Sequence, residues 1–223
     1  SKEVIPWGVK DVINPKLMSK YTGKGIKIAI LDSGIDFNHP DFGGNIQKGY
    51  NVLNPSALPI DDYGHGTLVA GIIAAQNNKF GIVGIAPEAD VYPVKVLDGY
   101  GEGNINDIVK GIDWCINNKI QIINMSFAIL DDKPMLSNSI KKAIDSNIII
   151  IASANNSYGG EVGYPASYDD IISVTAVDCN HKIAESAPVG KIDFCSPGVN
   201  ILTTNANDGY SLANGTSLST AYI

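Results

Sequence analysis

The sequence predicts an α/β fold in which a mostly parallel, twisted sheet is covered by helices on both faces. Short runs rich in β-branched residues indicate strands that are buried on both faces, and helix-length segments lie between most of them. Strands and helices in alternation imply right-handed crossovers, which join parallel strands. The predicted strands are 26–31, 91–96, 120–125, 148–152 and 171–177, and the predicted helices are 67–75, 105–117 and 136–145.

The elements differ in the pattern that predicts them. The strand 26–31 reads Ile-Lys-Ile-Ala-Ile-Leu and ends directly at Asp32, at the carboxyl edge where a parallel sheet gathers reactive groups. The last third of the chain, from Gly159 onward, is richer in Gly, Pro and Ser and is expected to contain more loop. The helix 105–117 is predicted by apolar residues at helical spacing, namely Ile105, Ile108, Val109, Ile112 and Ile116.

Length and composition fit one compact unit. With 223 residues, 44% of them apolar, and no repeat or linker that divides it, the chain is expected to form one domain over residues 1–223. The net charge of −7, with no run of Lys or Arg longer than a pair, argues against nucleic acid or an anionic membrane as a partner. The longest apolar run, 148–152 extended by Ser153 and Ala154, is far below the roughly 18 residues that cross a bilayer.

The N-terminus and the cysteines exclude other classes. Residues 1–7 have no charged leader followed by an apolar segment, so no signal peptide is expected within this chain. Cys115, Cys179 and Cys195 make an odd number without C-x-x-C spacing, which favours neither a disulfide framework nor zinc. Cys115 lies in an apolar helical stretch and is expected to be a small buried hydrophobe rather than a nucleophile.

Two polar residues stand out in the first third of the chain. Asp32 ends a predicted strand, although Asp-Ser-Gly is also typical of a plain turn. His65 lies between glycines at the start of a helix built on small residues, which allow close approach to its neighbours. The other two histidines, His39 and His181, lie in turn-like or polar sequence and are expected to be structural.

A third candidate is Ser217, which follows a glycine turn and precedes a helix start. By itself a serine at this place could be a helix cap. Taken together, however, the segments around Asp32, His65 and Ser217 resemble the motifs of the subtilisin family of serine proteases, in the family's order and over nearly the whole chain. The resemblance implies a subtilisin-like three-layer sandwich and a serine endopeptidase that works through an acyl-enzyme intermediate.

The resemblance also implies a role for each group. Ser217 would attack the peptide carbonyl, His65 would take its proton as general base, and Asp32 would orient the imidazole. Asn155 falls where the family places the asparagine of its oxyanion hole. The segments 94–97, 101–103 and 123–126 look like the walls of the family's cleft. The implied substrate-binding residues are Leu97, Gly101, Glu102, Gly103, Ser126, Phe127, Ala128, Ala152 and Gly163.

Several positions depart from the family pattern. Leu68 replaces the second histidine of His-Gly-Thr-His, which is expected to change packing only, and Ala154 stands where a glycine usually precedes the oxyanion asparagine. Ala128 is expected to narrow the pocket for the side chain before the scissile bond (P1). The chain stops at Ile223, six residues after Ser217, so the catalytic domain is expected to be truncated there.

A structural calcium ion is also implied by the resemblance. Calcium takes six or more oxygen ligands, which carboxylates, amides and the carbonyls of a curled loop can supply. Without the resemblance, the loop 76–82 would be interpreted as a solvated turn. The ligands that match the family's site are Glu3, Asp41, Gln76, Asn78, Phe80 and Ile82.

Two rival interpretations and the cellular context remain. The glycines at 99–103 lack the G-x-G-x-x-G order and a following helix start, which argues against a nucleotide-binding loop. A pseudoprotease that only binds peptides is the alternative to a protease. As a protease, the protein is expected to be a secreted monomer, with a cleaved pro-region, that acts on peptides or proteins, although its odd number of thiols leaves an intracellular protein open.

Overall fold

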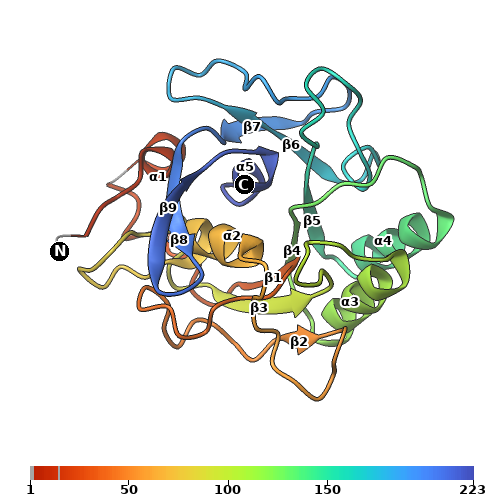
Figure 1. Ribbon diagram of the computed structural model, residues 1–223, viewed down its shortest axis with the longest axis horizontal. Helices are drawn as coiled ribbons and strands as arrows, with labels where there is room; N and C mark the ends of the chain where they lie inside the picture. The colour runs from red at the N-terminus through yellow and green to blue at the C-terminus, as the bar shows by residue number, and fades with distance from the viewer. Residues whose placement is uncertain (1–2, 15) are drawn as a thin grey trace.

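The computed structural model describes residues 3–14 and 16–223, and a seven-stranded sheet forms its centre (Figure 1). Every neighbouring pair in this sheet is parallel, in the order β2-β3-β1-β4-β5-β6-β7. The strands are β1 (Lys27–Asp32), β2 (Tyr50–Asn51), β3 (Asp90–Lys95), β4 (Ile122–Met125), β5 (Ile149–Ser153), β6 (Ile172–Val177) and β7 (Phe194–Pro197). An antiparallel hairpin, β8 (Ile201–Asn205) with β9 (Gly209–Ala213), lies outside the sheet. The helices are α1 (Trp7–Val12), α2 (His65–Ala74), α3 (Ile105–Asn117), α4 (Pro134–Asp145) and α5 (Thr216–Thr220).

Helices cover both faces of the sheet, as the sequence predicts. In Figure 1, α3 and α4 lie on one side, and α1, α2 and α5 lie on the other. The side chains of β1 alternate between two buried clusters: Ala29 and Leu31 join the cluster of α3 and α4, whereas Ile28 and Ile30 join that of α2 and α5. The α/β fold class is therefore confirmed.

The predicted strands and helices are confirmed to within about two residues at each end. Helix α2 begins at His65 rather than at residue 67, so the imidazole belongs to its first turn. The sequence analysis missed α1, β2, β7 and the hairpin. β2 has only two residues and the hairpin is rich in Thr and Asn, so neither carries a strong apolar pattern.

Helix α2 packs closely against two neighbours through glycines. A Cβ atom on Gly66 would lie 2.1 Å from the carbonyl oxygen of Gly34, and one on Gly71 would lie 2.1 Å from Oγ1 of Thr204. On the hairpin side, the hydroxyls of Thr203 and Thr204 donate to carbonyl oxygens of the first turn of α2, at 2.6 and 2.8 Å. The small residues in α2 therefore bring the helix that carries His65 into contact with both β1 and the hairpin.

The cysteines lie as the sequence predicts. All three are free thiols; Cys115 is buried in α3, and Cys179 and Cys195 are exposed. Burial raises the pKa of the Cys115 thiol, which keeps it protonated and unreactive. No helix among the described residues is both long and apolar enough to cross a bilayer.

Candidate active site

The carboxyl end of β1 brings the first two candidate residues together. Asp32 is fully buried, and both of its carboxylate oxygens lie 2.9 Å from Nδ1 of His65. The backbone N–H of Ser33 donates to Asp32 Oδ1 at 2.7 Å, which fixes the carboxylate from its own strand end. This geometry places the Nδ1 proton of His65 on the side of Asp32 and directs Nε2 away from it.

Opposing effects act on the pKa of His65. Burial alone would lower the pKa of His65, but the charge and hydrogen bond of Asp32, together with the charge of Asp61, raise it above its ordinary value. The His65 side chain keeps 24% of its surface exposed. It can therefore reach a substrate while its partner carboxylate stays out of water.

Ser217 lies in the first turn of α5, beside the carboxyl end of β4. Its hydroxyl donates to the carbonyl oxygen of Ser126 at 2.8 Å, and the hydroxyl of Ser126 donates to the carbonyl oxygen of Ser217 at 3.0 Å. Among the hydrogen bonds of the described residues there is none between Ser217 and His65. Hydrogen bonds between a nucleophile and its base often tighten only when substrate binds.

Asn155 follows the end of β5 in an unusual backbone conformation. Its φ is 101°, a value that non-glycine residues rarely adopt and that persists where the surrounding structure enforces it. Its side-chain oxygen accepts the N–H of Asn156 at 2.7 Å, and its N–H₂ group makes no hydrogen bond among the described residues. The oxygen of Asn156 in turn accepts the N–H of Thr216 at 3.0 Å and so ties this loop to the start of α5.

The structure brings together two predicted cleft residues, Gly163 and Ala128, and the predicted oxyanion-hole residue Asn155. A Cβ atom on Gly163 would lie 2.8 Å from that of Ala128 and 3.7 Å from that of Asn155. Ile129 and Tyr164 exchange backbone hydrogen bonds at 2.8 Å, which holds these two segments side by side. Among the other predicted cleft residues, Phe127 is half-buried, and Ser126 and Ala152 are buried.

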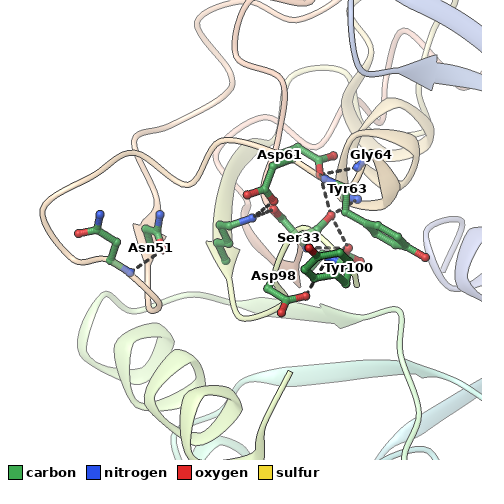
Figure 2. Close-up of polar contacts among 12 residues, drawn as sticks. Ser33, Asn51, Asp61, Tyr63, Gly64, Asp98 and Tyr100 are labelled. Atoms are coloured by element: carbon green, nitrogen blue, oxygen red, sulfur yellow. Dashed lines mark hydrogen bonds and ion pairs between the residues drawn. The ribbon is translucent and has the colours of Figure 1, made fainter. Parts of the chain in front are cut away.

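The other predicted cleft segment follows β3 into the loop at 98–103. Leu97 is buried, Gly101 is half-buried, and Glu102 and Gly103 are exposed. Asp98 shapes the loop because its carboxylate accepts the N–H groups of Tyr100 and Glu102, at 2.9 and 3.0 Å (Figure 2).

A buried carboxylate lies beside the loop 76–82, which could hold a cation. Asp41 is fully buried; Oδ2 accepts the N–H of Ile82 and the hydroxyl of Tyr210, both at 2.8 Å, whereas Oδ1 has no hydrogen-bond partner among the residues that the structure describes. Burial raises the pKa of Asp41, although these hydrogen bonds oppose the shift. A hard cation would satisfy the unpaired oxygen and offset this cost.

The other oxygens that the sequence predicts around Asp41 come from a short loop. The carboxylate of Glu3 accepts the N–H groups of Asn78 and Lys79, at 2.9 and 2.8 Å, so it is drawn to the loop. The N–H of Gln76 donates to the carbonyl oxygen of Asp41 at 2.9 Å. Among the described residues there is no group of three or more Asp, Glu, His or Cys side chains that could hold a metal ion, so any cation here would rely mainly on neutral oxygens. Calcium accepts such ligands, and the residues fit it.

Sequence reasoning missed a functional candidate, Asp61. Its buried carboxylate accepts hydrogen bonds from the hydroxyl of Ser33 and from the backbone before and within the first turn of α2 (Figure 2). The available signal was the carboxylate four residues before His65, at the start of a helix, where acidic residues are favoured.

Comparison with known proteins identifies the family. The model of the subtilase family matches residues 23–223. Subtilisin NAT of Bacillus subtilis subsp. natto is 40% identical over 226 residues, which cover 98% of this chain and 59% of the relative. The minor extracellular protease Epr of Bacillus subtilis (strain 168) is 40% identical over 90% of this chain and 31% of its own length. A subtilisin of Bacillus pumilus is 39% identical over 98% of this chain and 82% of its own. The chain belongs to the subtilase family.

The chain spans only part of the relatives that it matches. It covers 59% of subtilisin NAT and 31% of the protease Epr. The names of these relatives describe whole proteins.

Proposed function

We propose that the complete protein is a serine endopeptidase that uses Asp32, His65 and Ser217. The observation that carries this proposal is the buried Asp32 carboxylate, which lies 2.9 Å from His65 Nδ1 in a chain of the subtilase family. Paired in this way, His65 takes the Ser217 proton through Nε2 as the hydroxyl attacks the peptide carbonyl, and then gives it to the leaving amine. Water then hydrolyses the acyl-enzyme by the reverse sequence of proton transfers.

Asn155 serves the oxyanion in this proposal. Its side-chain N–H₂ group and the backbone N–H of Ser217 donate to the charge that forms on the carbonyl oxygen in the tetrahedral intermediate. Support comes from the enforced backbone conformation of Asn155 and from Asn156, which links its loop to α5.

The test is covalent labelling of the complete protein with a fluorophosphonate, followed by mass spectrometry of the peptides. An adduct on Ser217 is expected, because only an activated serine reacts. An adduct elsewhere, or none, would contradict the proposal, and peptide binding without labelling would favour a pseudoprotease.

The proposal also covers the domain organisation, the oligomeric state and the location of the enzyme. Residues 1–223 belong to one peptidase domain, which acts as a monomer on peptides or proteins outside the cell after loss of a pro-region. Support comes from the continuous sheet and from the relative that is named an extracellular protease. Activity found in the cell fraction rather than in the medium would argue against it.

The cleft residues suggest a preference for small or medium apolar side chains at P1. Gly163 leaves space in the pocket, and the Ala128 methyl beside it takes some of this space back. Glu102, exposed in the loop at 98–103, should favour basic residues further from the scissile bond. Profiling with a peptide library checks both points: equal cleavage after Trp and Ala, or an unchanged preference for basic residues in Glu102→Gln, would refute the assignment.

One calcium ion is proposed at Asp41, with Glu3, Gln76, Asn78, Phe80 and Ile82 as further ligands. The unpaired buried Oδ1 of Asp41 supports it. An ion bound only by the folded state stabilises that state, by about 2.7 kcal/mol at one hundred times its Kd. Chelation should therefore lower the thermal midpoint of the complete protein, and Asp41→Ala should abolish this response. An unchanged midpoint, with no calcium found by elemental analysis, would eliminate the site.

A further inference from the structure

The carboxylate of Asp61 is the most heavily hydrogen-bonded acceptor near the candidate triad. Its Oδ1 accepts the Ser33 hydroxyl at 2.8 Å and the N–H groups of Tyr63 and Gly64 at 3.2 and 2.7 Å. Its Oδ2 accepts the N–H and the hydroxyl of Thr67 at 2.8 and 2.6 Å. Asp61 is 9% exposed, so these five contacts replace most of its water.

These contacts give helix α2 the cap that its own N-cap residue lacks. Gly64 precedes the helix and offers no side-chain oxygen. Asp61 instead binds N–H groups on both sides of His65, at Gly64 and Thr67, and its charge is favourable at a helix N-terminus. The first turn, which carries the imidazole, is therefore fixed from both ends.

Ser33 connects this cap to Asp32. Its hydroxyl lies 2.8 Å from Asp61 Oδ1 and 3.3 Å from Asp32 Oδ1, and it also accepts the N–H of Gly66 at 3.0 Å. A hydroxyl has one proton to donate. Because Asp61 is the closer acceptor, the Ser33 proton is directed to it and not to the carboxylate that holds His65.

The loop that carries Asp61 is anchored from a second side. Lys95, 5% exposed at the end of β3, donates from Nζ to Asp62 at 2.5 Å and to the carbonyl oxygen of Ser33 at 2.6 Å. This ion pair holds the residue next to Asp61 against the strand end that carries Asp32 (Figure 2 shows Asp61 and Ser33 within the same group of polar contacts).

We propose that Asp61 is a positioning residue that fixes the first turn of α2, and with it His65, against Asp32 by way of Ser33. The inference rests on the proposed function, because that function makes His65 the general base. Asp61 itself does not touch substrate; it acts through the imidazole and through the hydroxyl of Ser33.

Loss of Asp61 should also change the titration of His65. The charged groups around the imidazole are Asp32 on β1, Asp61 and Asp62 in the loop before α2, and Lys95 on β3. On the hairpin side, the residues that share a pocket with His65 are the uncharged Asn205, Ala206 and Ser211. The charge of Asp61 raises the pKa of His65. In Asp61→Asn this pKa should fall, so the acid limb of the activity profile should move to lower pH.

The experiment measures Asp61→Asn in the complete protein by kinetics and by NMR titration of His65. We expect kcat to fall roughly tenfold to hundredfold with little change in KM, because a base displaced by less than an ångström transfers protons poorly. The NMR midpoint of His65 should fall as well. Asp90→Asn is the matched control, because it removes one charge at the opposite end of β3 and should change neither quantity.

Ser33→Ala keeps both carboxylates and the bonds of Asp61 to Gly64 and Thr67, but it removes the link through Ser33, including the acceptor for the N–H of Gly66. In the double variant the two effects on kcat should be less than additive if Ser33 links the residues. If Asp61→Asn does not fold, Ser33→Ala still decides, since its kcat should fall and the His65 midpoint should shift. The inference would be overturned if kcat stays within twofold of the parent value and the NMR midpoint of His65 is unchanged within error. Failure of the proposed function is separate: the parent would then not be labelled at Ser217.

Discussion

Ser217→Ala and His65→Ala are each expected to abolish peptide hydrolysis by the complete protein while leaving the fold intact. Without the hydroxyl there is no acyl-enzyme, and without the imidazole the hydroxyl stays protonated and unreactive. The expected loss in kcat is about 10⁶-fold, a magnitude known for subtilisin and carried over from it. Kinetics with a chromogenic peptide, beside circular dichroism of each variant, provide the measurement.

Ser219→Ala is a suitable control for this pair. Ser219 lies on the same short helix as Ser217, but its hydroxyl is buried and has no hydrogen-bond partner in the described part of the chain, so its removal should cost little. Hydrolysis by Ser217→Ala within tenfold of the parent would mean that another group is the nucleophile.

Asn155→Ala is expected to lower kcat by about 10² to 10³-fold and to leave KM nearly unchanged. The amide donates only to the charge that develops in the transition state, so ground-state binding does not depend on it. This range is again the one known for the corresponding asparagine of subtilisin. Steady-state kinetics separate the two constants.

Asn155→Asp provides the matched comparison, because it keeps the shape of the side chain and removes the N–H donors. It should lose at least as much activity as Asn155→Ala. A rise in KM with an unchanged kcat would instead make Asn155 a residue that binds the ground state.

The sequence predicts the parallel sheet well because its strands are short apolar runs that are buried on both faces. Ile28 and Ile30 pack on one side and Ala29 and Leu31 on the other, so the polar residues of the strand are confined to its two ends, Lys27 and Asp32. The predicted pair of Asp32 and His65 is also brought together, because both residues stand at the ends of well-signalled elements.

The parts that the sequence analysis missed depend on contacts between distant segments. The hairpin β8–β9 is held against α2 because the hydroxyls of Thr203 and Thr204, on β8, donate to carbonyl oxygens of α2. No local sequence pattern reveals these contacts. Asp61 accepts five hydrogen bonds from four residues, and only the folded loop shows that Ser33 is one of these donors. An Asp before a helix looks the same in sequence whether it caps one turn or also connects to a second carboxylate.

The close packing of helix α2 limits how this protein could be engineered. Many stabilising designs replace glycine by alanine inside a helix, because alanine lowers the entropy of the unfolded chain. At Gly66 and Gly71 an added methyl would lie 2.1 Å from an oxygen of a neighbouring segment, so the same replacement would push α2 away from β1 or from the hairpin. A mutant library for thermostability should keep both positions fixed and sample the solvent-facing positions of α3 and α4 instead.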